Sequence, residues 1–132
     1  MAKPIMHAFS SSKKFGGKPE DYIEIHNFMD SSKSVISDNR HRALTHNSWF
    51  LNSVLERVFG LTITNSDGKE ISVKAIGEEH VLEDYGHNFI PSAQDFLQEI
   101  EYKGWMNGHG VPGSRLRVES KRNKTFIPFN SD

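Results

Sequence analysis

The sequence predicts an α+β fold, because two helical repeats are followed by a short stretch of alternating residues. From Tyr22 to Ile36 and from Leu44 to Val58, residues that are apolar except for Ser32 and Ser48 recur every three or four positions, which is the helical period. After Gly60 the period changes to two, which is typical of a half-buried strand. We therefore expect a helical hairpin over residues 19–36 and 39–59, a two-stranded β-hairpin over 61–64 and 70–73, two shorter helices, and an irregular C-terminal arm.

Capping and turn residues set the expected ends of these elements. Pro19 opens the first helix, and two acids follow it at the positive end of the helix dipole. Asp67-Gly68 supplies the positive φ that a tight hairpin turn requires. The two shorter helices are expected over residues 77–85 and 93–102, with Ser92 as the N-cap of the latter.

Length and charge predict one small domain with basic ends. The chain has 132 residues, too few for two full domains, and a formal net charge of −1. Residues 1–18 and residues 103–132 each contribute +4, which leaves −9 for the residues between them. We expect a basic N-terminal segment over 1–18, an α+β core over 19–104 and a C-terminal arm or tail over 105–132.

Composition excludes several classes of protein. The chain has no cysteine, which excludes disulfides, zinc–thiolate sites and cysteine nucleophiles. No apolar run approaches the length of about 18 residues that a membrane-spanning helix needs, and residues 1–6 lack the apolar core of a secretory signal. We expect a cytoplasmic protein without a membrane partner. Nucleic-acid binding stays an open but weak alternative, because the basic ends lack closely interleaved aromatic residues.

Histidine is the most unusual feature of the composition: five of the seven histidines lie between residues 26 and 87. His26 and Asp30 are four residues apart, and so are His80 and Asp84, so each pair shares one face of a helix. His41 extends the inward face of the second helix. Imidazole and carboxylate groups bind zinc, manganese, iron and nickel. The predicted metal ligands are His26, Asp30, His41, His80 and Asp84.

Further polar residues surround these candidate ligands. His46 lies about 200° from Leu44 on a helical wheel, which directs it away from the inward face. The Arg40-His41-Arg42 triplet is a positive cluster at a helix start, where an anion can bind. Residues that support the metal ligands or bind an anion are therefore expected at Arg40, Arg42, His46 and His87. His7 and His109 are assigned to flexible ends.

Four stretches of the sequence carry a resemblance to a known family. They are HAFSSSKKFGGKPEDY (residues 7–22), RHRAL (40–44), TITNSDG (62–68) and IGEEH (76–80). Over about residues 7–102 the chain resembles an uncharacterised family of small proteins from phage and bacterial genomes, known as a domain of unknown function. The resemblance implies an intracellular phage or bacterial origin. It does not indicate an activity or a cofactor. It marks His26, Asp30, His41, His46, His80 and Asp84 as positions to test.

Two functions fit these observations. The first is a small intracellular interaction protein, phage-encoded if the resemblance holds, that associates with itself or with a host or viral partner through its terminal arms. Its expected anchors are Trp105, Phe126 and Phe129, because aromatic residues concentrate at the centres of interfaces.

The second function is a His/Asp metal-binding protein, or a hydrolase that uses a metal-bound water to cleave a phosphate ester or related bond. The sequence favours interaction, because it contains no intact catalytic motif. Whether the protein is an enzyme stays open at this point.

Overall fold

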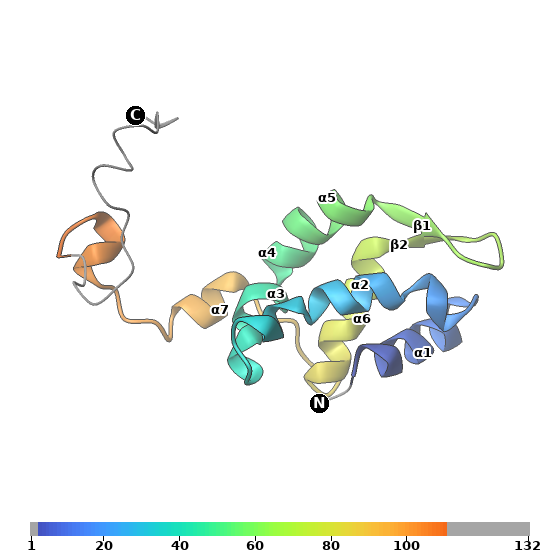
Figure 1. Ribbon diagram of the computed structural model, residues 1–132, viewed down its shortest axis with the longest axis horizontal. Helices are drawn as coiled ribbons and strands as arrows, with labels where there is room; N and C mark the ends of the chain where they lie inside the picture. Colours follow the sequence, from blue (N-terminus) through green and yellow to red (C-terminus); the bar gives the residue numbers. More distant parts are fainter. Residues whose placement is uncertain (1–2, 111–132) are drawn as a thin grey trace. The chain divides into compact units, whose positions relative to one another are not determined.

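Helices and one two-stranded antiparallel sheet make up the computed structural model, which describes residues 3–110 (Figure 1). The predicted α+β class is therefore confirmed. The chain divides into two units, residues 1–100 and 101–132. The described part of the second unit holds one 3₁₀ helix, η5 (Gly104–Asn107). Over residues 3–110, every helix is too short or too polar to cross a membrane.

Helix α1 (Pro4–Phe15) occupies most of the segment that we expected to be a basic N-terminal extension. It packs against α2 (Ile23–Met29) and α6 (Val73–Asp84), as Figure 1 shows. The buried side chains of α1 are His7, Ala8 and Ser11. Because this inward face is small and polar, its helical period does not appear in the pattern of apolar residues.

The helix expected over residues 19–36 is broken into three pieces. They are the 3₁₀ helix η1 (Pro19–Asp21), α2, and the 3₁₀ helix η2 (Ser31–Ser34). Ser31 donates its hydroxyl to the Phe28 carbonyl at 2.7 Å, and Ser34 donates to the Ser31 carbonyl at 2.9 Å. Such serine bonds compete with the helical backbone ladder, so α2 ends at Asp30.

The helix expected over residues 39–59 is broken once, at His46 and Asn47. The 3₁₀ helix η3 (Asn39–His41) and α3 (Arg42–Thr45) come before the break. A second helical stretch follows it, made of α4 (Ser48–Phe50), the π-helical turn η4 (Leu51–Leu55) and α5 (Glu56–Phe59). Asn47 caps this stretch by accepting the Phe50 N–H at 2.9 Å, which is the reason that a new helix begins there.

The predicted β-hairpin is confirmed. Strand β1 (Thr62–Thr64) pairs antiparallel with β2 (Glu70–Ser72), with Ile63 opposite Ile71. Two side chains fix the hairpin loop to the turn after α1: Asp67 accepts the Gly17 N–H at 2.9 Å, and Asp21 accepts the Ser66 N–H at 2.8 Å. A two-stranded hairpin is marginal alone, so these bonds and the burial of Ile71 hold it on the helices.

Helix α6 lies at the centre of the first unit and begins four residues earlier than expected. Ser72 caps it by accepting the Ala75 N–H at 3.1 Å. Gly77 lets α6 approach the π-helical turn closely, because a Cβ there would lie 2.5 Å from Leu55 Cδ2 and 2.7 Å from Leu51 Cδ2. Both leucines are fully buried, so the close approach belongs to the core.

The last helix of the first unit, α7 (Ala93–Leu97), is shorter than the predicted span of residues 93–102. Its predicted N-cap is confirmed, because Ser92 accepts the Asp95 N–H while Asp95 accepts the Ser92 N–H in return. Most of the irregular C-terminal arm expected over residues 105–132 lies beyond residue 110 and so outside the described residues.

The packing at Gly77 leads to a stability prediction. We expect Gly77→Val to lower the free energy of unfolding by about 1–3 kcal/mol, because two buried leucines would have to move. The matched control is Lys74→Val, which places the same side chain on the partly exposed face of α6 and carries only a helix-propensity cost of about 0.5 kcal/mol. Urea denaturation measures both variants; equal losses would contradict the packing argument.

Candidate metal centre

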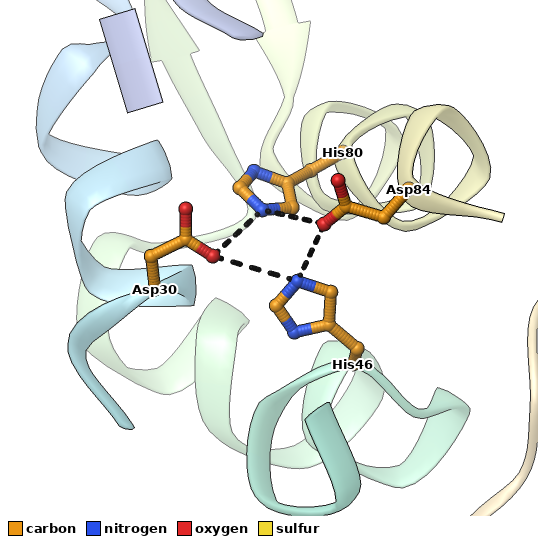
Figure 2. A group of neighbouring side chains, drawn as sticks. All are labelled: Asp30, His46, His80 and Asp84. Atoms are coloured by element: carbon orange, nitrogen blue, oxygen red, sulfur yellow. Dashed lines mark hydrogen bonds and ion pairs between the residues drawn. The ribbon is translucent and has the colours of Figure 1, made fainter. Parts of the chain in front are cut away.

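Four side chains from three parts of the chain meet in the interior of the first unit (Figure 2). Asp30 comes from the end of α2, His46 from the end of α3, and His80 and Asp84 from α6. The helix breaks described above create this meeting point. His46 leaves the helical conformation, with φ −106° and ψ 52°, and Asp30 does so with φ −98° and ψ 4°.

The ligand atoms alternate between nitrogen and oxygen around a small ring. His46 Nε2 lies 3.0 Å from Asp84 Oδ2 and 3.6 Å from Asp30 Oδ1. His80 Nε2 lies 3.2 Å from Asp30 Oδ1 and 3.5 Å from Asp84 Oδ2. All four atoms lie within 4.8 Å of one another.

These separations match a four-coordinate metal site. A tetrahedral zinc ion with ligands at about 2.0–2.1 Å separates neighbouring ligand atoms by about 3.3 Å. The four nitrogen–oxygen distances, 3.0 to 3.6 Å, surround that value. The other two separations, between the two nitrogens and between the two oxygens, are within 4.8 Å, so a tetrahedral ion would require these pairs to close by up to about 1.5 Å.

The group is buried on every side. The side chains of His46 and His80 are 0% exposed, that of Asp84 is 2% exposed and that of Asp30 is 5% exposed. Two carboxylates removed from water this completely need cations or strong hydrogen-bond donors beside them. The surrounding residues supply both.

His80 is oriented from behind by a second buried histidine. His80 Nδ1 lies 2.8 Å from Nδ1 of His26, and Nε2 of His26 lies 2.7 Å from the Ser11 hydroxyl. When His80 Nε2 binds a metal, its Nδ1–H donates to His26, and His26 donates onward to Ser11. When no metal binds, the same three groups can carry their hydrogen bonds in the opposite direction.

His46 has an equivalent chain of partners on the other side of the centre. His46 Nδ1 lies 2.8 Å from the Thr45 hydroxyl, which lies 3.1 Å from the Ser32 hydroxyl. Ser32 in turn contacts His41 Nδ1 at 2.7 Å and the His41 carbonyl at 3.2 Å. The rings of His46 and His80 therefore each have a hydrogen-bond partner on the nitrogen that faces away from the centre, an arrangement that is usual for histidines that bind a metal.

Two cationic groups flank Asp84 on its remaining oxygen. His7 Nε2 lies 3.4 Å from Asp84 Oδ1, and Arg42 Nη2 lies 3.8 Å from the same oxygen. His7 also pairs with Glu83 through Nδ1 at 2.6 Å, and its ring stacks on His80 with centroids 3.8 Å apart. Asp84 can therefore bind a metal through Oδ2 while Oδ1 stays neutralised.

Both carboxylates of the centre are ionised. Burial opposes the charge on Asp84, but the hydrogen bond from His46 and the ion pair with His7 outweigh burial and hold its pKa well below the ordinary value. Burial likewise opposes the charge on Asp30, and the hydrogen bond from His80 outweighs it, so the pKa of Asp30 is also lowered. The centre offers two anionic oxygens at neutral pH.

The histidines divide into neutral and charged groups. Burial lowers the pKa of His80 to about 4, although the hydrogen bond to Asp30 opposes this effect. Burial, with the neighbouring His80 and His7, lowers the pKa of His26 to about 2. His7 differs: burial opposes its charge, but the ion pair with Asp84 and the hydrogen bond to Glu83 outweigh burial and raise its pKa to about 9. A neutral imidazole is the form that binds metal, and His80 is in this form at pH 7.

The structure brings together three of the five predicted metal ligands: Asp30, His80 and Asp84. The other two, His26 and His41, are buried but turn toward His80 and Ser32 instead of joining the four. His46 replaces them. Its predicted outward direction was wrong, because the wheel assumed a helix continuous through residue 46.

Of the other residues that the sequence singled out, only Arg42 contacts the centre within the described part of the chain. Arg40 pairs with Asp38 at the surface at 2.7 Å, and His87 is exposed with a left-handed φ of 65°. Arg42, in contrast, does reach Asp84. Trp105 belongs to the second unit and is 46% exposed. The predicted anchors Phe126 and Phe129 lie outside the described residues.

His7 is the functional neighbour that the sequence analysis missed. It was assigned to a flexible end, whereas α1 buries it against the centre at 1% exposure. Pro4, a residue that is common in the first turn of a helix, was the available signal. The four-residue spacing of His7 and Ser11 on one helix face supports the same conclusion.

A comparison with protein families identifies the family of the chain. The model of a family described as a domain of unknown function (DUF6915) matches residues 2–106. The chain belongs to this family. The DUF6915 match spans α1 through α7 and so includes every residue of the centre. No curated protein and no solved structure gives a significant match to this DUF6915 domain.

The raised pKa of His7 leads to a prediction of pH dependence. A folded-state pKa of about 9 exceeds the ordinary value of 6.5, so protonation of His7 stabilises the fold below about pH 6.5, and this stabilisation is lost as the pH rises through 9. We expect the stability difference between the native protein and His7→Gln to shrink by up to about 3 kcal/mol from about pH 6 to about pH 9.5.

Urea denaturation with a chelator present measures this difference without any contribution from metal. Glu83→Gln serves as the control, because removal of one anionic partner should make the pH effect of His7 smaller. A stability difference that stays constant or grows with rising pH would contradict the assignment of a charged His7.

Proposed function

We propose that this protein binds one divalent transition-metal ion through Asp30, His46, His80 and Asp84. The observation that carries the proposal is the convergence of two buried imidazole nitrogens and two buried carboxylate oxygens, contributed by three separate parts of the chain, within 4.8 Å. Separations of 3.0 to 3.6 Å between neighbouring ligand atoms support a single shared ion.

Hydrogen bonds among the four side chains account for their arrangement less well than a shared metal ion does. A ring nitrogen carries at most one hydrogen and can donate it along one direction, yet Nε2 of His46 and Nε2 of His80 each face two carboxylates. The other oxygen of Asp30, Oδ2, accepts no hydrogen bond and has only a long ion pair of 3.7 Å with Lys33. Two adjacent anions in a dry interior repel each other, and a dication between them removes that repulsion.

The donor set favours zinc. Two nitrogen and two oxygen donors in a four-membered set match the tetrahedral coordination of this ion. Manganese, iron and nickel accept the same donor types and are the alternatives. Calcium and magnesium fit poorly, because they take six or more oxygen ligands.

The proposed metal has a structural role. Four protein ligands complete a tetrahedral set, whereas a catalytic zinc site has three protein ligands and a fourth position open to water. The ion would fasten the end of α2, the end of α3 and helix α6 to one another. Hydrolysis of a phosphate ester stays an alternative, and it requires one of the four ligands to leave.

Metal binding has a direct test. Zinc titrated into chelator-treated protein should bind one ion per chain and raise the melting temperature, because a ligand of the folded state alone stabilises it. Each of Asp30→Asn and His46→Gln should weaken binding by about 100-fold, since each removes one ligand. Calorimetry and a thermal melt measure both quantities.

The matched control is His87→Gln, the same substitution at an exposed histidine outside the centre. It should bind zinc as the native protein does. If the native protein binds none of zinc, manganese, iron and nickel, and its melting temperature does not change with any of them, the proposal fails whatever the variants do.

Association with a protein partner is a second proposed function, and it rests on a different observation. Three large apolar side chains in the described part of the second unit are exposed, which is typical of residues that contact a partner. They are Tyr102, Trp105 and Met106. Trp105 and Met106 belong to the C-terminal arm expected over residues 105–132.

The arm can be tested by its removal. If the chain self-associates, a variant without residues 107–132 should contain fewer chains per particle in solution. If the partner is another protein, the variant should no longer bind it. Light scattering measures the mass, and Trp105→Ala in the full chain should reduce the same association. An unchanged number of chains per particle together with unchanged partner binding would exclude the arm as an interface.

A further inference from the structure

A cleft of about 610 Å³ lies between α3 and α7, beside the metal centre. Its volume falls within the range of about 300–1,000 Å³ that is usual for small-molecule sites. The apolar part of its lining is formed by Ala43, Tyr85, Phe96 and Ile100. We call it the α3–α7 cleft.

Arg42 connects this cleft to the metal centre. Its side chain lines the cleft and is 11% exposed, and its guanidinium carbon lies 5.1 Å from the centroid of the Tyr85 ring. Its one ion pair among the described residues is the long 3.8 Å contact with Asp84. A nearly buried guanidinium with so weak a partner keeps most of its capacity to bind an anion.

The other charges of the cleft compete little with Arg42. Arg40 is exposed and already engaged by Asp38 through three side-chain contacts of 2.7 to 3.1 Å. Glu99 is exposed, so water and salt screen its charge. Arg42 is therefore the group that can fix the charged end of a ligand.

We propose that the α3–α7 cleft binds a small organic anion, with its acidic group on Arg42 and its apolar body against Tyr85, Phe96 and Ile100. A carboxylate, sulfonate or phosphate oxygen pair matches the planar fork of a guanidinium. The apolar walls supply affinity by burying a hydrophobic body, and Arg42 supplies orientation.

The position of Arg42 also couples this cleft to the metal, a part of the inference that rests on the proposed function. Without metal, the carboxylates of Asp30 and Asp84 repel an incoming anion and attract Arg42. A dication bound by Asp84 through Oδ2 would weaken the attraction between Asp84 and Arg42, which would favour binding of the ligand to Arg42. Metal should therefore strengthen anion binding, and by linkage the anion should strengthen metal binding by the same factor.

A pair of fluorescent probes tests the site. The anionic probe is 8-anilinonaphthalene-1-sulfonate, and the neutral probe is N-phenyl-1-naphthylamine, which has the same aromatic body without the sulfonate. We expect Arg42→Met to weaken binding of the anionic probe by about tenfold or more and to leave the neutral probe within about twofold. Arg42→Lys, which keeps the charge, should recover part of the loss.

Two matched variants localise the binding. Arg40→Met removes an arginine of the same cleft and should change neither probe by more than about twofold, because Asp38 already holds it. Ala43→Phe fills the cleft and should weaken both probes. If Arg42→Met binds both probes as the native protein does, or if Ala43→Phe binds them unchanged, the cleft site is wrong.

Zinc separates the two proposals. In the native protein, saturating zinc should tighten binding of the anionic probe by about fivefold or more, and this gain should be absent in Arg42→Met. If zinc binds but the probe affinity does not change, the coupling is wrong. If zinc does not bind at all, the proposed function fails, whereas a loss of anionic-probe binding confined to Arg42→Met still supports the cleft site.

Discussion

The placement of two ionised carboxylates side by side in the interior is the constraint on which this structure depends. Asp30 and Asp84 are almost completely shielded from water, and their oxygens are shared by the same two imidazole nitrogens. Such a pair is costly in an apolar environment. His46 and His80 contact both carboxylates, and His7 and Arg42 flank Asp84, so these four side chains compensate that charge.

The backbone is shaped by the same requirement. Where a continuous helix would have carried His46 away from the interior, a break at Asn47 turns it inward. The end of α2 at Asp30 and the serine bonds that follow it have a comparable effect. The hydroxyls of Ser11, Ser32 and Thr45 then hold the buried rings in position. Features that weaken regular helix thus build the centre, in keeping with the concentration of irregular backbone at functional sites.

Local signals in the sequence were sufficient for the β-hairpin and for the pairing of His80 with Asp84, because both depend on neighbours in the chain. The Asp67-Gly68 turn fixes the hairpin, and a spacing of four residues places two side chains on one helix face. His46 and His7 required more than local signals. The direction of His46 depends on a cap at Asn47 that interrupts an apparent helical period, and the burial of His7 depends on a polar helix face that has no apolar repeat.

X-ray absorption spectroscopy of the zinc-loaded protein tests the central claim most directly, because it reports the atoms around the metal without any substitution. Coordination by Asp30, His46, His80 and Asp84 predicts four nitrogen or oxygen ligands at about 2.0 Å and the outer scattering of two imidazole rings. A six-coordinate shell of oxygen atoms without imidazole scattering would show that zinc binds elsewhere and would contradict this account.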